Sequence, residues 1–193
     1  MKQMNKALVG ISLIFGIQAI GAANYHRLSD DDDDMMMHWK MPLMTDSDFL
    51  DAAIAGQNCE IALGRLAQKN GSDSFTSSFG NMMVRDHGKA LDDLEVILST
   101  RRTYGSASMS AFKNLRQDLT ESDQRTYNWL GGMSGSSFDD AYRHQMIEDH
   151  KMALRMFKME AVQATDPDLR LFASKYIPAI KNHLMALKNK TMP

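Results

Sequence analysis

Residues 138–161 read FDDAYRHQMIEDHKMALRMFKMEA, and the spacing of their apolar positions indicates the fold. These positions recur every three or four residues, which places them on one face of an α-helix. They are Phe138, Tyr142, Met146, Ala153, Phe157 and Ala161, with His150 as a polar residue inside the same stripe. No segment of the sequence alternates with the period of two that is typical of a β-strand. The stretch therefore predicts an amphipathic helix in an all-α protein.

Stripes of the same kind occur along the rest of the chain. They predict helices at about 48–70, 74–102, 137–164 and from 166 to about 187. A weaker helical stretch covers 111–130, and the cap-like residues 120–123 interrupt it. Long helices with short connections form bundles. We expect residues 46–190 to form an up-down four-helix bundle with an extra short crossover helix.

The first 23 residues have the organisation of a secretory signal peptide. Lys2 and Lys6 precede an uncharged apolar run at 7–20, and small residues follow it up to Ala23. The run is shorter than the ~20 apolar residues that a membrane span needs. We therefore expect cleavage after Ala23, no membrane span, and a mature protein that is periplasmic in a Gram-negative cell or secreted.

Charge and cysteine content exclude some classes of function. Removal of the two lysines in the signal segment lowers the net charge from −2 to −4. A mildly acidic surface argues against nucleic acid as a partner. Cys59 is the only cysteine in the sequence, so no internal disulfide can form.

Residues 24–45 are predicted to be a disordered tail rich in Asp and Met. Five consecutive acids at 30–34 repel one another and extend the chain. The residues after them suit Cu(I) or Ag(I), because thioethers and imidazoles are soft ligands. These candidates are Met35, Met36, Met37, His38, Trp39, Met41 and Met44. The alternative, which we favour, is a linker without bound metal.

Each of the four long helices carries one polar residue within its apolar stripe. These residues are Glu60, His87, His150 and His183. At 1.5 Å per residue, the two members of each predicted hairpin differ in height by only ~5 Å. Three imidazoles and one carboxylate suit one transition-metal ion, such as zinc, iron or copper. The alternative is a hydrogen-bonded packing layer, and the sequence does not decide whether the two hairpins lie at the same level.

A short motif occurs twice around two of these histidines. Residues 83–91 read MVRDHGKAL and residues 146–154 read MIEDHKMAL. Asp86 and Asp149 lie ~100° around the helix from their histidines. Each could orient a histidine ring on a neighbouring helix, or could simply be solvated, which we favour. Glu160 lies further along the same helix and could form a second polar layer.

These motifs resemble a known family. The two Asp-His-x-x-Ala segments at 86–90 and 149–153 match its pattern, as do residues 49–53, 60–67, 138–142, 177–178 and His183. The family is the exported bacterial "domain of unknown function 4142". The resemblance covers about residues 46–188 and implies a ferritin-like fold.

The resemblance does not imply a di-iron centre. Ferritin-like proteins often bind two irons through Glu-x-x-His motifs. The positions three residues before the histidines are instead Val84, Ile147 and Ile180. We therefore do not expect a di-iron oxidase or an iron-storage cage.

Three functions follow from the sequence. The first is a metal-binding bundle in envelope metal handling or stress tolerance. The second is a structural or interaction module whose Glu/His layer only sets packing, and the third is a Cu(I)- or Ag(I)-binding protein that acts through the tail. No Ser-His-Asp or Cys-His arrangement and no Gly-rich phosphate loop is supported by spacing, which favours a protein that is not an enzyme. Enzyme activity would need an open metal position, which the sequence does not reveal. The sequence does not decide whether the protein forms a homo-oligomer or binds a protein partner.

Overall fold

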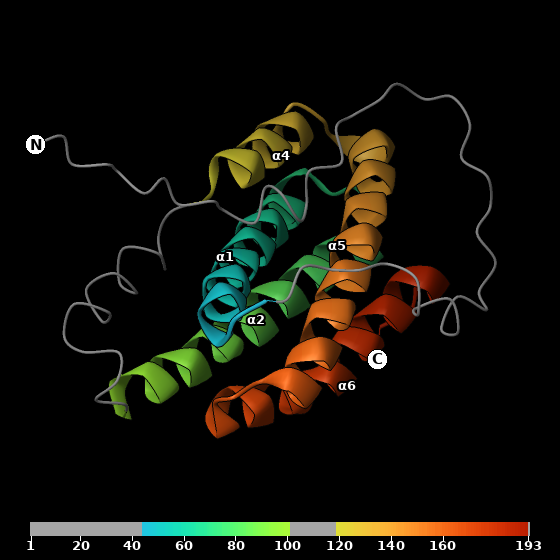
Figure 1. Cartoon of the computed structure of the whole chain (residues 1–193). Helices are drawn as coiled ribbons and strands as arrows, with labels where there is room; N and C mark the ends of the chain where they lie inside the picture. The colour runs from blue at the N-terminus through green and yellow to red at the C-terminus, as the bar shows by residue number, and fades with distance from the viewer. Residues whose placement is uncertain (1–43, 101–118, 193) are drawn as a thin grey trace, which may run out of the picture.

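The computed structural model describes residues 44–100 and 119–192, which form five α-helices (Figure 1). These are α1 (Asp46–Asn70), α2 (Ser74–Thr100), α4 (Glu121–Gly131), α5 (Gly135–Gln163) and α6 (Pro167–Asn189). The described residues contain no strand, which confirms the prediction of an all-α bundle. The signal segment, most of the tail and the predicted helical stretch at 111–118 lie outside the described residues.

Side-chain caps determine where three of the helices begin. The hydroxyl of Thr45 accepts the backbone N–H of Asp48 at 3.2 Å, and the Asp48 carboxylate accepts the backbone N–H of Thr45 at 3.0 Å. This reciprocal arrangement is a capping box. Thr120 accepts the backbone N–H of Asp123 at 3.1 Å, so the interruption that we predicted at 120–123 is the start of α4. Asp166 caps α6, and the first residue of α6 is a proline.

The long helices are arranged as two hairpins, α1 with α2 and α5 with α6 (Figure 1). Within the first hairpin the two backbones approach closely at Gly64 and Gly80. A Cβ atom at Gly64 would lie 2.8 Å from the carbonyl oxygen of Gly80, and one at Gly80 would lie 2.5 Å from that of Gly64. Any side chain at either position would push α1 and α2 apart, which explains both glycines.

Each hairpin turn is bound by an aspartate from the other hairpin. The Asp46 carboxylate, at the start of α1, accepts the backbone N–H groups of residues 165 and 166 at 3.1 and 2.7 Å. The Asp139 carboxylate, near the start of α5, accepts those of residues 72 and 73 at 3.0 and 3.1 Å. We call these two sets of bonds the interhairpin contacts. One set lies at each end of the bundle, and together they fix the height of one hairpin relative to the other.

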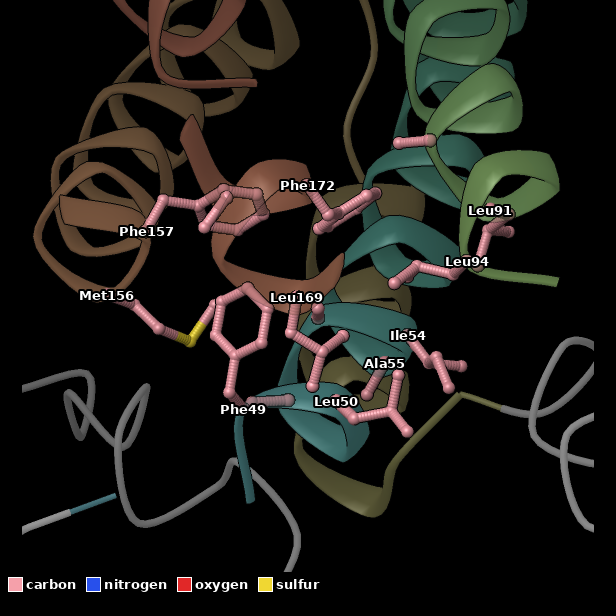
Figure 2. Packing of buried hydrophobic residues seen from close by; sticks show 14 of the residues in the cluster. Phe49, Leu50, Ile54, Ala55, Leu91, Leu94, Met156, Phe157, Leu169 and Phe172 are labelled. Atoms are coloured by element: carbon pink, nitrogen blue, oxygen red, sulfur yellow. The ribbon is translucent and has the colours of Figure 1, made fainter. Parts of the chain in front are cut away.

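The core consists of two apolar clusters, one toward each end of the long helices, with polar residues between them. Aromatic rings in the first cluster meet edge to face, with 5.2 Å between the ring centroids of Phe49 and Phe157 (Figure 2). The first cluster includes Phe49, Leu94, Phe157, Leu169 and Phe172, and the second includes Leu63, Phe79, Met83, Phe138 and Tyr142. Along α1, α2 and α5 the polar residue of the stripe falls between the two clusters, and on α6 His183 lies at the end of the first cluster that is nearer the second. This order places the candidate ligands near the middle of the bundle.

Candidate metal centre

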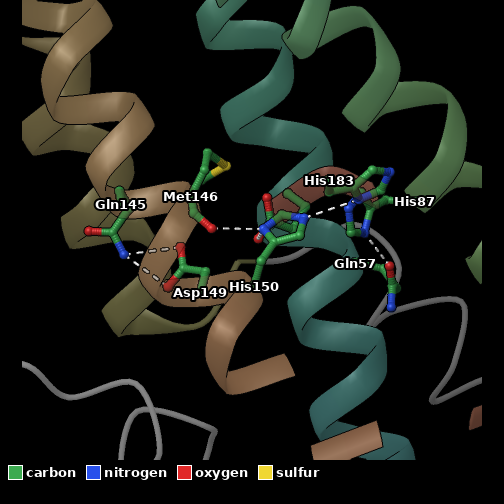
Figure 3. Close-up of polar contacts among 8 residues, drawn as sticks. Gln57, His87, Gln145, Met146, Asp149, His150 and His183 are labelled. Carbon is green, nitrogen blue, oxygen red and sulfur yellow. Dashed lines mark hydrogen bonds and ion pairs between the residues drawn. The ribbon is translucent and has the colours of Figure 1, made fainter. Parts of the chain in front are cut away.

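Three helices bring one histidine each to a single point in the core (Figure 3). His87 comes from α2, His150 from α5 and His183 from α6. Their ring centroids are 5.2 to 5.6 Å apart, and one nitrogen of each ring lies within 4.8 Å of the other two. The histidines of the two hairpins therefore lie at the same level along the bundle, in agreement with the interhairpin contacts.

Hydrogen bonds define which ring nitrogens of His150 and His87 carry hydrogen. Nδ1 of His150 lies 2.9 Å from the backbone carbonyl oxygen of Met146, which can only accept. Nδ1 of His87 lies 2.5 Å from the side-chain oxygen of Gln57, which also accepts. Both rings therefore donate through Nδ1, and in the neutral ring Nε2 keeps its lone pair. The Nε2 atom of His87 is buried and has no hydrogen-bond partner among the described residues.

His183 is oriented by a carboxylate. Its Nε2 lies 3.1 Å from Oδ2 of Asp86. Partial burial opposes ionisation of Asp86, but hydrogen bonds from Arg85 and His183 outweigh it, and the pKa of Asp86 is held below its ordinary value. An ionised Asp86 accepts the Nε2 hydrogen of His183. Nδ1 of His183 is then unprotonated and faces Nε2 of His150 at 3.2 Å.

The environment keeps all three rings neutral. Burial lowers the pKa of His150 to about 3, and the nearby His183, which would repel a second positive charge, contributes to the shift. Burial also lowers the pKa of His87 well below its ordinary value, with further lowering from His150 and His183. Burial lowers the pKa of His183 as well, although Asp86 partly offsets it. Neutral imidazole is the form that binds a metal ion.

The spacing of two of the free nitrogens fits the ligands of one metal ion, and one nitrogen of His87 lies within 4.8 Å of a ligand atom of each of the other two histidines. Two lone pairs that face each other at 3.2 Å repel unless a cation lies beside both. With metal–nitrogen distances of about 2.0–2.1 Å, two ligands of a tetrahedral ion lie about 3.3 Å apart. Each ring also uses its other nitrogen as a donor to Met146, Gln57 or Asp86. Such outer hydrogen bonds are typical of histidine ligands in metal sites.

Glu60 lies beside this group but on another side of His150. Its Oε1 is 3.7 Å from Nδ1 of His150, which is not the nitrogen that faces His183. Its Oε2 is buried and has no hydrogen-bond partner in the described part of the chain. Burial raises the pKa of Glu60 well above its ordinary value, and the carboxylates of Asp149 and Asp123 raise it further. The structure thus brings the predicted quartet together, with the histidines converging and the carboxyl group adjacent.

The other acidic candidates have different surroundings. Asp86 contacts His183, as described above, whereas Asp149 accepts two hydrogen bonds from the side chain of Gln145 (Figure 3). Burial raises the pKa of Asp149 to about 7. Glu160 is buried near Asp46 and Asp166 at the α5–α6 turn, not at the histidines. Among the tail candidates, the residues from Met35 to Met41 lie outside the described residues, and Met44 packs against the first apolar cluster.

Two residues with a role in the site were not among the sequence candidates. Gln57, which accepts the hydrogen of His87, lies one helical turn before Glu60 on α1, and this spacing could have identified it. Gly56 lines a cavity of about 70 Å³ that adjoins all three histidines. Nothing in the sequence distinguishes Gly56 from a glycine needed for close helix packing.

Fold and site together define a helical bundle with a buried three-histidine centre. Residues 34–189 match the family described as "Domain of unknown function (DUF4142)", and the chain belongs to this family. The match begins at residue 34, so it includes part of the tail, and the range of about 46–188 that we expected starts too late. A search of curated proteins and a search of solved structures each found no match. None of the helices described here is long and apolar enough to cross a membrane.

Proposed function

We propose that this protein is an exported, ferritin-like bundle that binds one transition-metal ion through His87, His150 and His183, in metal handling or stress tolerance of the cell envelope. The observation that carries the proposal is the convergence of three histidine rings, one nitrogen of each within 4.8 Å of the other two, together with an orienting hydrogen bond on each ring. A layer needed only for packing would be expected to pair these nitrogens with hydrogen-bond donors, since an unpaired buried polar group costs about 1–3 kcal/mol.

The chemistry of the ligands favours a divalent first-row ion. Imidazole suits zinc, copper and iron alike, so the ligand types alone do not choose among them. The histidines add no charge, and Asp86 supplies one carboxylate through His183. Export is supported by the basic, apolar and small residues at the start of the sequence.

The test is the metal content of the protein, purified from the full chain without a metal-binding tag. We expect about one equivalent of metal per chain after dialysis against zinc, iron or copper salts. His150→Ala should lose this metal. His144→Ala is the matched control, because His144 is an exposed histidine on the same helix, and this variant should keep it.

Deletion of residues 30–43 separates the bundle site from the tail and leaves the cap residue Thr45 in place. Metal that survives this deletion but not His150→Ala supports the proposal. Metal that is lost with the tail instead would favour Cu(I) or Ag(I) capture by its methionines. If no metal binds at all, the histidines form a packing layer in a structural or interaction module.

A further inference from the structure

The cavity beside the histidines is bordered by small residues from several helices. Ala52, Ala53 and Gly56 of α1 line it, as do Ala90 of α2 and Ala153 of α5. Its volume of about 70 Å³ is several times the roughly 10–15 Å³ that a cavity needs to hold one water molecule. The space therefore accommodates a small ligand next to the three rings.

Gly56 has no packing role that would explain it. A Cβ atom at Gly56 would meet nothing within 4 Å in the described structure, in contrast to the tight contact at Gly64. A glycine in a helix interior costs roughly 0.5–1 kcal/mol relative to alanine. Gly56 lies beside Gln57 and one turn before Glu60, on the part of α1 that borders the site. What it provides is open space beside the centre.

The coordination of the centre is incomplete. Among the described residues, the group whose ligand atoms converge within 4.8 Å contains only the three histidines. Structural zinc sites take four protein ligands, whereas sites that act on a ligand keep three and leave one position open. Neutral imidazoles add no charge and Asp86 balances only one of the two charges of a divalent ion, which favours a singly charged anion at the open position. The unpaired Oε2 atom of Glu60, which lines the same cavity, is a polar group that such a ligand could contact.

We propose that the metal centre keeps one coordination position open toward the cavity at Gly56 and binds a small monodentate anion there. This inference rests on the proposed function, because it requires metal on the three histidines. It adds that the centre is a ligand-binding site and not a closed structural one.

The experiment uses the full chain loaded with Co(II), whose visible absorption reports the ligands of the ion, and azide as the probe anion. We expect azide to change the Co(II) spectrum in a saturable way. The series Gly56→Ala, Gly56→Val and Gly56→Leu should keep Co(II) bound and weaken azide binding as the side chain grows, by about ten-fold or more for leucine. Gly88→Leu is the matched control, because Gly88 also has open space in a helix but lines a different hollow.

The outcomes separate the two proposals. Bound Co(II) whose spectrum does not respond to azide would overturn the open position and leave the metal site intact. An azide affinity that is the same in wild type and throughout the Gly56 series would overturn the role of the cavity. If Gly56→Leu binds no Co(II), the azide affinity of Gly56→Ala, the smallest change, is compared with that of the wild type instead. Absence of a Co(II) site in the wild-type protein would instead overturn the proposed function.

Discussion

At the scale of single residues, the two copies of the Asp-His motif differ in what the aspartate contacts. Asp86 accepts a hydrogen bond from the ring of His183, whereas Asp149 accepts its bonds from Gln145. A carboxylate on the outer nitrogen of a ligand histidine fixes the ring and makes it a stronger ligand. Two aspartates in the same sequence context should therefore differ in their effect on metal affinity.

Asp86→Ala should weaken metal binding by about 10–100-fold, because His183 loses its orienting partner. Competition with a chromophoric chelator measures this directly. Asp149→Ala is the internal control and should change the affinity by less than about threefold, the size of an indirect electrostatic effect. Equal losses of affinity in the two variants would show that the total negative charge near the site, and not the contact with His183, determines the affinity.

The sequence predicted the three candidate histidines but not the protonation of their rings. A polar residue inside an apolar stripe is visible from spacing alone, and this pattern identified His87, His150 and His183. The hydrogen on each ring depends instead on Gln57, on the carbonyl group of Met146 and on Asp86. A backbone carbonyl has no sequence signature, so the protonation of the rings could be inferred only from the three-dimensional structure.

At the scale of the helices, the element boundaries followed from apolar periodicity and caps, but the relative height of the two hairpins did not. That height depends on the interhairpin contacts of Asp46 and Asp139. Both residues lie near the start of a helix, where aspartate is common because it interacts well with the helix dipole. Sequence reasoning therefore could not distinguish their long-range role from ordinary local stabilisation.

Glu160, which lies near Asp46, should make the stability of the fold depend on pH. It is buried near the carboxylates of Asp46 and Asp166, and its Oε1 has no hydrogen-bond partner among the residues described. Burial, followed by these two charges, raises the pKa of Glu160 from 4.5 to about 7. Between these values the folded protein holds a proton that the unfolded chain has lost. Stability must therefore fall as pH rises through this window.

Glu160→Gln should remove this loss of stability. We expect the variant to exceed the wild type by about 1 to 2 kcal/mol in free energy of unfolding at pH 8, and by much less at pH 5. Urea unfolding at both pH values gives the comparison. Glu121→Gln, at a side chain that is 91% exposed, should leave the pH dependence unchanged. A wild-type protein that is as stable at pH 8 as at pH 5 would contradict the argument.

At the scale of the whole molecule, the polar centre lies between two apolar clusters, and residues of both hairpins meet there. A metal ion on His87, His150 and His183 would connect α2 to α5 and α6, so it would link the hairpins in the middle as Asp46 and Asp139 link them at the ends. Unfolding separates these ligands and releases the ion. Metal binding should therefore stabilise the complete fold and not one helix.

Zinc at about 100 times its dissociation constant should add about 2.7 kcal/mol to the free energy of unfolding and raise the melting temperature by about 5 to 10 °C. Circular dichroism with and without zinc measures the shift. His150→Leu should abolish it, because one ligand is gone while an apolar side chain fills the space, and His144→Leu should retain it. A shift of the same size in His150→Leu would mean that zinc stabilises the protein from its surface, and the three histidines would then be a layer of the core whose function is to position the two hairpins.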